Sequence, residues 1–155
     1  MAFTDDPDGD QFFALRTHRA DGTPVGTPIW LAPAGDRWYG YTPGRSWKVR
    51  RIQANPRVEV ARCTFDGTPT GPWRSGTARV LPPGEIRRAE RALTAKYGTK
   101  FRIFVLTTLL GSFRRSGGRA VGLEIDIPDG LPALRRQLSA GTAERYRIFR
   151  RWSAR

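Results

Sequence analysis

The sequence predicts a mainly β fold, namely a six-stranded antiparallel barrel with a few peripheral helices. Short apolar or alternating segments recur along the chain, and turns rich in Gly, Pro and Asp separate them, as in antiparallel sheets. Few segments have helical spacing, so the regular strand–helix alternation of a parallel sheet is missing. A closed barrel also removes the exposed edges that short strands would otherwise present. The expected strands are 12–18, 25–31, 37–42, 58–64, 73–81 and 120–127.

The first three strands form a meander. Asp21-Gly22 is a hairpin signal after the first strand, and Gly35-Asp36 marks the turn before the third. In the fourth strand the period of two places Val58 and Val60 on one face and Glu59 on the other. These turns and alternations support the β assignment.

Three helices are expected between and beside the strands. Ser46 precedes a basic, amphipathic segment that Pro56 ends, so a helix with a serine cap is expected over 47–55. A charged helix is expected over 85–97, closed by Gly98. The apolar segment 101–110 predicts a buried helix.

Length and composition set the class of protein. The chain has 155 residues, the size of one domain, and a formal net charge of +13 that favours an anionic partner. It contains no apolar stretch of about 18 residues, and its start lacks the pattern of a secretory signal, so a cytoplasmic protein is expected. The chain has a single cysteine, Cys63, so an internal disulfide is excluded. With a single histidine, His18, in addition, the sequence offers no set of residues typical of a metal site.

The chain divides into a barrel domain, 1–127, and a basic helical extension, 128–155, which is expected to pack on it. Two short amphipathic helices are predicted in the extension, over 131–138 and 143–152. The second is basic with aromatic residues, as in helices that lie on membrane surfaces, but packing on the protein is the preferred interpretation. The sequence has no recognition helix or zinc finger, which argues against nucleic-acid binding.

The strongest chemical signal lies where the third strand ends and the first helix begins. Thr42 and Ser46 supply hydroxyl groups there, and Lys48 and Arg50 supply cations. A helix start also presents free N–H groups and a partial positive charge, so the segment has the makeup of a phosphate site. A solvated basic helix with an ordinary serine cap explains the same residues equally well.

Pro28 marks an edge or a bulge in the second strand, because proline cannot donate to a sheet ladder. The backbone there is free to approach a planar ligand. Trp30, Trp38 and Tyr41 could stack on such a ligand, although for any one of them filling the barrel is the better interpretation.

Several runs in this order resemble the pyridoxamine-phosphate-oxidase-like superfamily, and most of all its PPOX-class branch that uses the deazaflavin coenzyme F-420. The resemblance covers roughly residues 12–127 and no single motif in it is diagnostic. The runs are GTPVGTPIWL (22–31), WYGYT (38–42), SWKVRRIQANPRV (46–58), GPW (71–73), GTARVL (76–81) and VGLEI (121–125).

The resemblance implies a split β-barrel whose cofactor lies in a groove between the two protomers of a homodimer. Ser46 and Lys48 match positions that hold the cofactor phosphate, with Thr42 beside them, Arg50 as a second cation and Trp47 in the same run. Residues matching those that line the tricyclic ring are Pro28, Ile29 and Trp30, and Trp73 is expected near the partner's site.

The resemblance favours coenzyme F-420 over FMN. FMN-binding oxidases place basic residues at both ends of the strand that here runs from Thr27 to Ala32, and both of these are neutral. The basic surface also suits the phosphodiester and oligoglutamate tail of the deazaflavin. The expected function is therefore hydride transfer from the cofactor to an unsaturated organic acceptor, with no catalytic side chain assigned. An FMN-dependent oxidoreductase and a non-catalytic flavin- or deazaflavin-binding protein are the alternatives.

Overall fold

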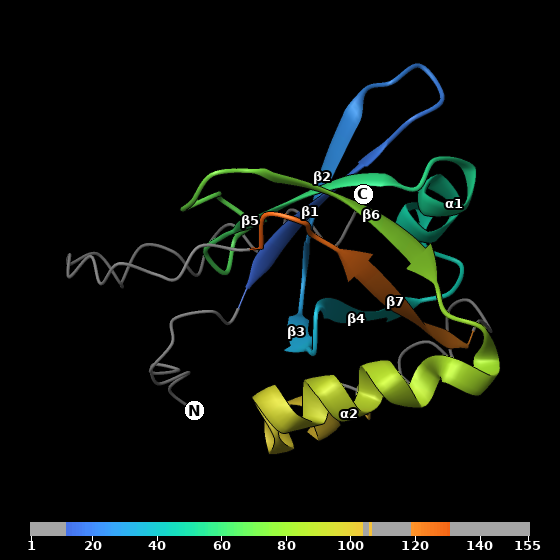
Figure 1. Cartoon of the computed structure of the whole chain (residues 1–155), viewed down its shortest axis with the longest axis vertical. Helices are drawn as coiled ribbons and strands as arrows, with labels where there is room; N and C mark the ends of the chain where they lie inside the picture. Colours follow the sequence, from blue (N-terminus) through green and yellow to red (C-terminus); the bar gives the residue numbers. More distant parts are fainter. Residues whose placement is uncertain (1–11, 104–105, 107–118, 131–155) are drawn as a thin grey trace.

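The computed structural model describes residues 12–103, 106 and 119–130. Seven strands form one antiparallel sheet in the order β2-β1-β5-β6-β7-β4-β3. The sheet curls into a half-barrel, with α1 near one end and α2 beneath β3 and β4 (Figure 1). The elements are β1 Phe13–His18, β2 Pro24–Ile29, β3 Leu31–Ala34, β4 Arg37–Pro43, α1 Trp47–Ala54, β5 Arg57–Arg62, β6 Arg74–Val80, the 3₁₀ turn η1 Pro83–Glu85, α2 Ile86–Tyr97 and β7 Ala120–Asp126.

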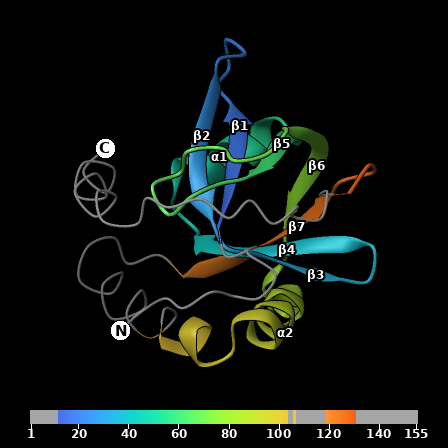
Figure 2. The same ribbon diagram turned by 90° about the vertical axis from the view of Figure 1, so that its left-hand side faces the viewer.

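This architecture confirms the predicted mainly β, antiparallel split-barrel class but corrects its strand count. The strand expected over 25–31 is two strands, β2 and β3, that meet at Trp30. β2 pairs with β1, whereas β3 pairs with β4 at the opposite end of the sheet. The chain therefore crosses between the two sheet edges at Trp30, which closes the curl on one side (Figure 2).

The concave side of the sheet holds the main core. Ile29 and Leu31 both point into it, so the inward alternation continues across the change of strand at Trp30. Each fully buried aliphatic or aromatic side chain of this kind contributes about 1.5–3 kcal/mol. The buried members are Phe13, Leu15, Ile29, Leu31, Ile52, Val58, Val60, Ala78, Leu123, Ile125 and Ile127.

α2 covers the outer face of β3, β4 and β7 and makes a second core. The helix was predicted over 85–97 and occupies Ile86–Tyr97, and it ends at Gly98, whose φ of 56° suits glycine. Its buried face is formed by Ala89, Ala92, Leu93 and Tyr97. A Cβ on Gly122 of β7 would lie 3.0 Å from Ala89 Cβ, so the glycine permits this close packing.

α1 packs by Val49 and Ile52 against β1 and β6, and it ends before Pro56 as predicted. The third expected helix, 101–110, is helical where the structure describes it, at 101–103 and 106. Phe101 is buried, but Ile103 is 50% and Leu106 60% exposed, so burial of the whole segment was a wrong prediction. The helices expected over 131–138 and 143–152 lie outside the described residues.

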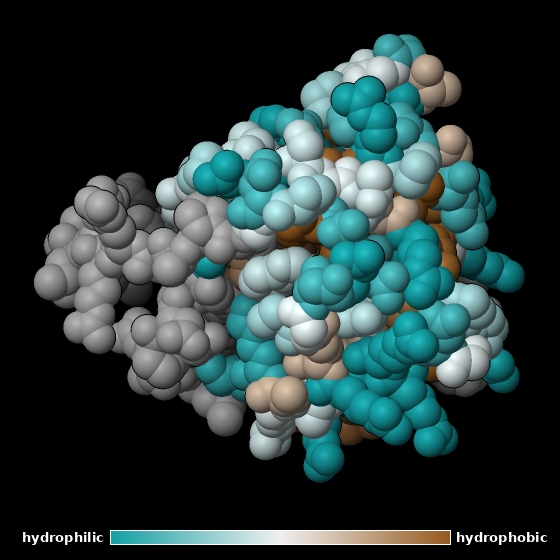
Figure 3. Space-filling model, in the orientation of Figure 1, coloured by the Kyte–Doolittle hydropathy of each residue, from teal (hydrophilic) through white to brown (hydrophobic). Residues whose placement is uncertain are grey.

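The face in Figure 3 is largely hydrophilic, with small hydrophobic areas between polar side chains. Within the described residues, no helix is both long and apolar enough to cross a membrane.

Candidate cofactor-binding site

The turn between β4 and α1 is fixed by two backbone hydrogen bonds. Ser46 N–H donates to Pro43 O at 3.1 Å, and Gly44 N–H donates to Arg119 O at 2.9 Å. A Cβ on Gly44 would lie 2.6 Å from Arg119 O. Position 44 therefore requires glycine because the backbone at Arg119, just before β7, passes so close to it. This contact explains the glycine, so no bound ligand is needed to explain it.

Two hydroxyl groups beside this turn are buried without hydrogen-bond partners, namely Thr42 Oγ1 and Ser46 Oγ. Ser46 occupies the N-cap position of α1, as predicted, but its side chain makes no capping hydrogen bond. A buried polar group without a partner costs about 1–3 kcal/mol. Two such groups within five residues, next to a helix start whose first N–H groups also lack helical partners, fit an anion that accepts hydrogen bonds.

Lys48 is the second residue of α1 and lies within its first turn. Burial, and to a smaller extent the neighbouring Arg51 guanidinium, lowers its pKa to about 8. The first turn of α1 contains no acidic residue. A phosphate at this place would stabilise the charged ammonium and supply an acceptor for both hydroxyls, so Thr42, Ser46 and Lys48 fit a phosphate group.

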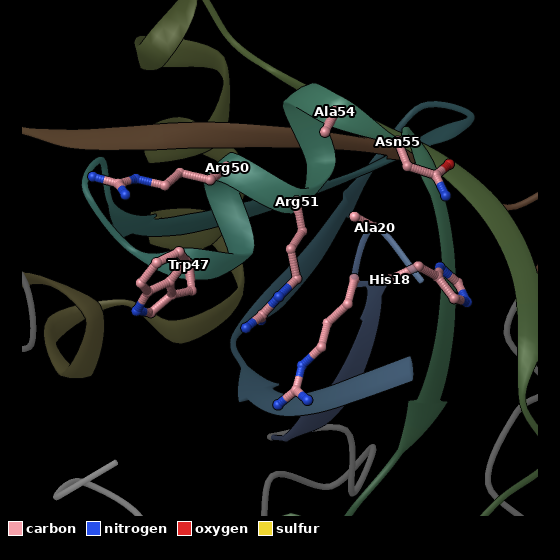
Figure 4. Close-up of a pocket in the computed structure, with 8 residues that line it drawn as sticks. His18, Ala20, Trp47, Arg50, Arg51, Ala54 and Asn55 are labelled. Atoms are coloured by element: carbon pink, nitrogen blue, oxygen red, sulfur yellow. The ribbon is translucent and has the colours of Figure 1, made fainter. Parts of the chain in front are cut away.

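Trp47 and Arg50 belong to the same helix but point to its solvent side. The Trp47 indole is 67% exposed, and the Arg50 guanidinium lies 5.0 Å from its ring centroid. Together with the end of β1 and the β1–β2 turn they form a groove, here named the α1 groove (Figure 4). The residues that line it are His18, Arg19, Ala20, Trp47, Arg50, Arg51, Ala54 and Asn55.

β2 is an edge strand, which confirms the interpretation of Pro28. Pro28 and Trp73 line one small cavity on the outer face of β1 and β2, here named the β2 cavity, with a volume of about 310 Å³. Arg16 crosses its wall, with the guanidinium 3.6 Å from the Trp73 ring centroid. The structure thus brings Pro28 and Trp73 together, and it adds Arg16, which sequence reasoning missed because alternation alone does not reveal a stacking partner.

The other predicted ring-lining side chains pack within the protein. Ile29 lies in the main core, and Trp30 stacks on Tyr97 of α2 with ring centroids 4.8 Å apart. Trp38 contacts the Phe13 ring and Tyr41 the Phe101 ring. Trp38 therefore packs against the main core, as the interpretation of a barrel-filling side chain expected, whereas Tyr41 belongs to the second core under α2 and does not fill the barrel.

Apart from Ile29 and Trp30, which pack within the protein, the predicted site residues form three groups. Thr42, Ser46 and Lys48 lie at the start of α1, Trp47 and Arg50 line the α1 groove, and Pro28 and Trp73 line the β2 cavity. Arg19 of the α1 groove was not singled out from the sequence, because only the tertiary fold brings the β1–β2 turn beside α1. Each group stays separate: the α1 groove contains only Trp47 and Arg50 of these residues, and the β2 cavity only Pro28 and Trp73.

Solved structures share the fold at low sequence identity. One is a pyridoxamine 5'-phosphate oxidase-related, FMN-binding protein of Nostoc punctiforme, with a TM-score of 0.50, 16% identity, and coverage of 76% of this chain and 71% of that one. Another is the heme storage protein HutZ of Vibrio cholerae, with a TM-score of 0.54, 11% identity, and coverage of 78% and 84%. A protein of unknown function from Agrobacterium tumefaciens has a TM-score of 0.53 at 18% identity, and the match covers 77% of this chain but 54% of that longer one.

Among proteins with curated descriptions, none matches the sequence significantly. The family profile described as pyridoxamine 5'-phosphate oxidase, however, matches residues 5–127, which is most of the chain. The curled antiparallel sheet and the profile match agree, and the chain belongs to the pyridoxamine 5'-phosphate oxidase-like split-barrel family.

Proposed function

We propose that the chain binds coenzyme F-420, with FMN as the alternative, and that it transfers hydride to an unsaturated organic acceptor as a homodimer. The observation that carries this proposal is the pair of buried, unpartnered hydroxyls of Thr42 and Ser46 beside Lys48. In its reduced form such a cofactor supplies the hydride. The chain's own residues bind and orient it.

The phosphate of the cofactor is assigned to the start of α1. Thr42 and Ser46 would each donate an O–H, and Lys48 would donate from its ammonium group. These donors are positioned before binding by the backbone hydrogen bonds of the β4–α1 turn. Such preorganisation lowers the cost of ordering on binding.

Two positions support coenzyme F-420 over FMN. Thr27 of β2 has a buried Oγ1 without a partner and Ala32 of β3 is fully buried, so neither position offers a cation for a second phosphate contact. The net charge of +13 suits a cofactor with a longer anionic tail.

The size of the β2 cavity supports the proposed homodimer. Its volume of about 310 Å³ is at the lower end of ligand pockets, roughly 300–1,000 Å³. A second protomer placed against Pro28 and Trp73 would enlarge and close this cavity around a tricyclic ring. Light scattering of the purified protein, with and without cofactor, tests the assembly.

The binding test is a titration of the full chain with coenzyme F-420 and, separately, with FMN. Lys48→Ala should weaken binding roughly 10- to 150-fold, and Thr42→Val or Ser46→Ala roughly 2- to 10-fold each. The matched control is Arg87→Ala, which removes an exposed cation from α2. Unchanged affinity in all three site variants would overturn the assignment.

The same experiments separate the alternatives. Tighter binding of FMN than of coenzyme F-420, with the same response to Lys48→Ala, would assign the protein to the flavin-dependent alternative. Binding without turnover of any acceptor in a broad panel of unsaturated compounds would favour the non-catalytic binding protein. Binding of neither cofactor would contradict the proposal altogether.

A further inference from the structure

The α1 groove is built on the face of α1 that turns away from the core. Trp47, Arg50, Arg51 and Ala54 follow one another at i, i+3, i+4 and i+7, the spacing of one helix face. The end of β1 and the following turn form the opposite wall with His18 and Ala20 (Figure 4), and Arg19 between them also lines the groove. The groove has a volume of about 880 Å³, within the range of small-molecule sites.

The charges in this groove are predominantly positive. Arg19, Arg50 and Arg51 form no ion pair with any residue that the structure describes. Two acids lie near the groove. Asp21 accepts a hydrogen bond from Thr23 N–H at 2.9 Å and interacts with the charge of Arg19, and Glu59 lies 3.6 Å from Arg16 and 3.9 Å from His18 Nε2, so the three arginines still outnumber them. Unpaired guanidinium groups in a concave surface favour a ligand with several negative charges.

Trp47 adds a planar surface to these charges. Its indole is 67% exposed at one end of the groove, where packing within the described protein does not require an aromatic residue. Indole rings bind planar bases by stacking, and Arg50, which lies over the ring, can extend the stack. An aromatic platform beside guanidinium groups is a combination that binds both parts of a nucleoside phosphate, the base and the phosphates.

We propose that the α1 groove is a second binding site, which takes a nucleoside phosphate by stacking its base on Trp47 and binding its phosphates with Arg19 and Arg51. The site lies on the solvent face of α1, whereas Val49 and Ile52 hold the opposite face against the sheet. The proposal therefore gives Trp47 and Arg50 a role in the α1 groove. The proposal does not depend on which cofactor binds at the start of α1. The source of the ligand is either a free nucleotide or a single-stranded nucleic acid.

Calorimetric titrations of the full chain test the proposal with three probes: ADP, inorganic pyrophosphate and a short oligothymidylate. The double variant Arg19→Ala/Arg51→Ala should weaken binding of all three. Its matched control, Arg87→Ala/Arg91→Ala, removes the same charge from exposed positions of α2 and should leave binding unchanged. Trp47→Ala should weaken ADP and oligothymidylate roughly 5- to 150-fold and leave pyrophosphate unchanged, and Trp47→Phe should retain most of the affinity.

The three probes also identify the source. Binding of ADP at least as tight as that of oligothymidylate would assign a free nucleotide. Tighter binding of oligothymidylate, with affinity that falls by about 0.7 log units per phosphate contact for each log unit of salt, would assign single-stranded nucleic acid.

Three results would overturn the proposal. The first is equal affinity for ADP and pyrophosphate in the unmodified protein. The second is an equal loss of affinity in Arg19→Ala/Arg51→Ala and in the control Arg87→Ala/Arg91→Ala. The third is an affinity for ADP that Trp47→Ala does not change. Loss of cofactor binding in Lys48→Ala with ADP binding intact would show that the two sites are separate.

Discussion

Replacing Lys48 by methionine should stabilise the ligand-free protein at neutral pH. Methionine keeps the length of the apolar stem and removes the charge, which is held at a partly buried position. The ordinary pKa of 10.5 and the lowered value of about 8 differ by an amount worth about 3 kcal/mol. Because the side chain is only partly shielded from water, we expect a gain of about 1–3 kcal/mol in the free energy of unfolding.

The gain should disappear as the pH rises. Folded Lys48 loses its proton near pH 8, whereas the unfolded chain keeps it until about 10.5. Between these values the unfolded state binds more protons, so the stability of the unmodified protein rises with pH relative to the variant. The difference is largest below pH 8 and closes at about pH 10.5.

Urea unfolding of both proteins, at a series of pH values from 7 upwards, measures this difference. Arg91→Met is the control, because it removes a charge from an exposed position of α2 and should change stability by less than about 0.5 kcal/mol. If Lys48→Met were less stable than the unmodified protein at pH 7, or if the difference did not depend on pH, the ammonium group would be fully solvated and the reasoning wrong. If the proposed phosphate site is correct, the same variant should also bind the proposed cofactor more weakly, so stability and binding should change in opposite directions.

Two further predictions concern the sheet. Gly76→Ala should lower the free energy of unfolding by about 1–3 kcal/mol, because the new Cβ would overlap the carbonyl oxygen of Asp126, whereas Gly84→Ala, with open space around it, should be nearly neutral in the same urea titration. Cys63 should not react with a thiol reagent at pH 8 until the protein unfolds, because burial raises its pKa to about 12; rapid labelling of the folded protein would contradict this.

Local pattern in the sequence was sufficient for most of the sheet. The alternation of Val58 and Val60 with Glu59, and the Asp21-Gly22 turn, each report on a strand or hairpin within a few residues. The change from β2 to β3 at Trp30 could not be predicted from such local patterns. Ile29 and Leu31 both face the core, so the apolar pattern continues unbroken while the pairing partner changes from β1 to β4.

For the candidate site, too, local patterns found some residues but not the surroundings that give them their properties. A serine before a basic helix marks the start of α1, and this local signal found Ser46 and Lys48. It did not reveal that the hydroxyl of Ser46 lacks a partner or that Lys48 is desolvated, because both depend on packing by distant segments. Arg19 and Arg16 were missed for the same reason, since each joins its cavity through the tertiary fold.

β7 joins two parts of the sheet that precede it in the chain. β2, β1, β5 and β6 form one part and the β3–β4 hairpin forms the other, and β7 lies between β6 and β4. Until residues 120–126 have been synthesised, the facing edges of β6 and β4 lack this partner, and pairs such as Tyr39 with Glu124 must close a long loop. Open strand edges on a nascent chain pair readily with other chains. The sheet can therefore be completed only late in synthesis, and interruption of translation ahead of residue 120 should yield aggregates rather than a partly folded barrel.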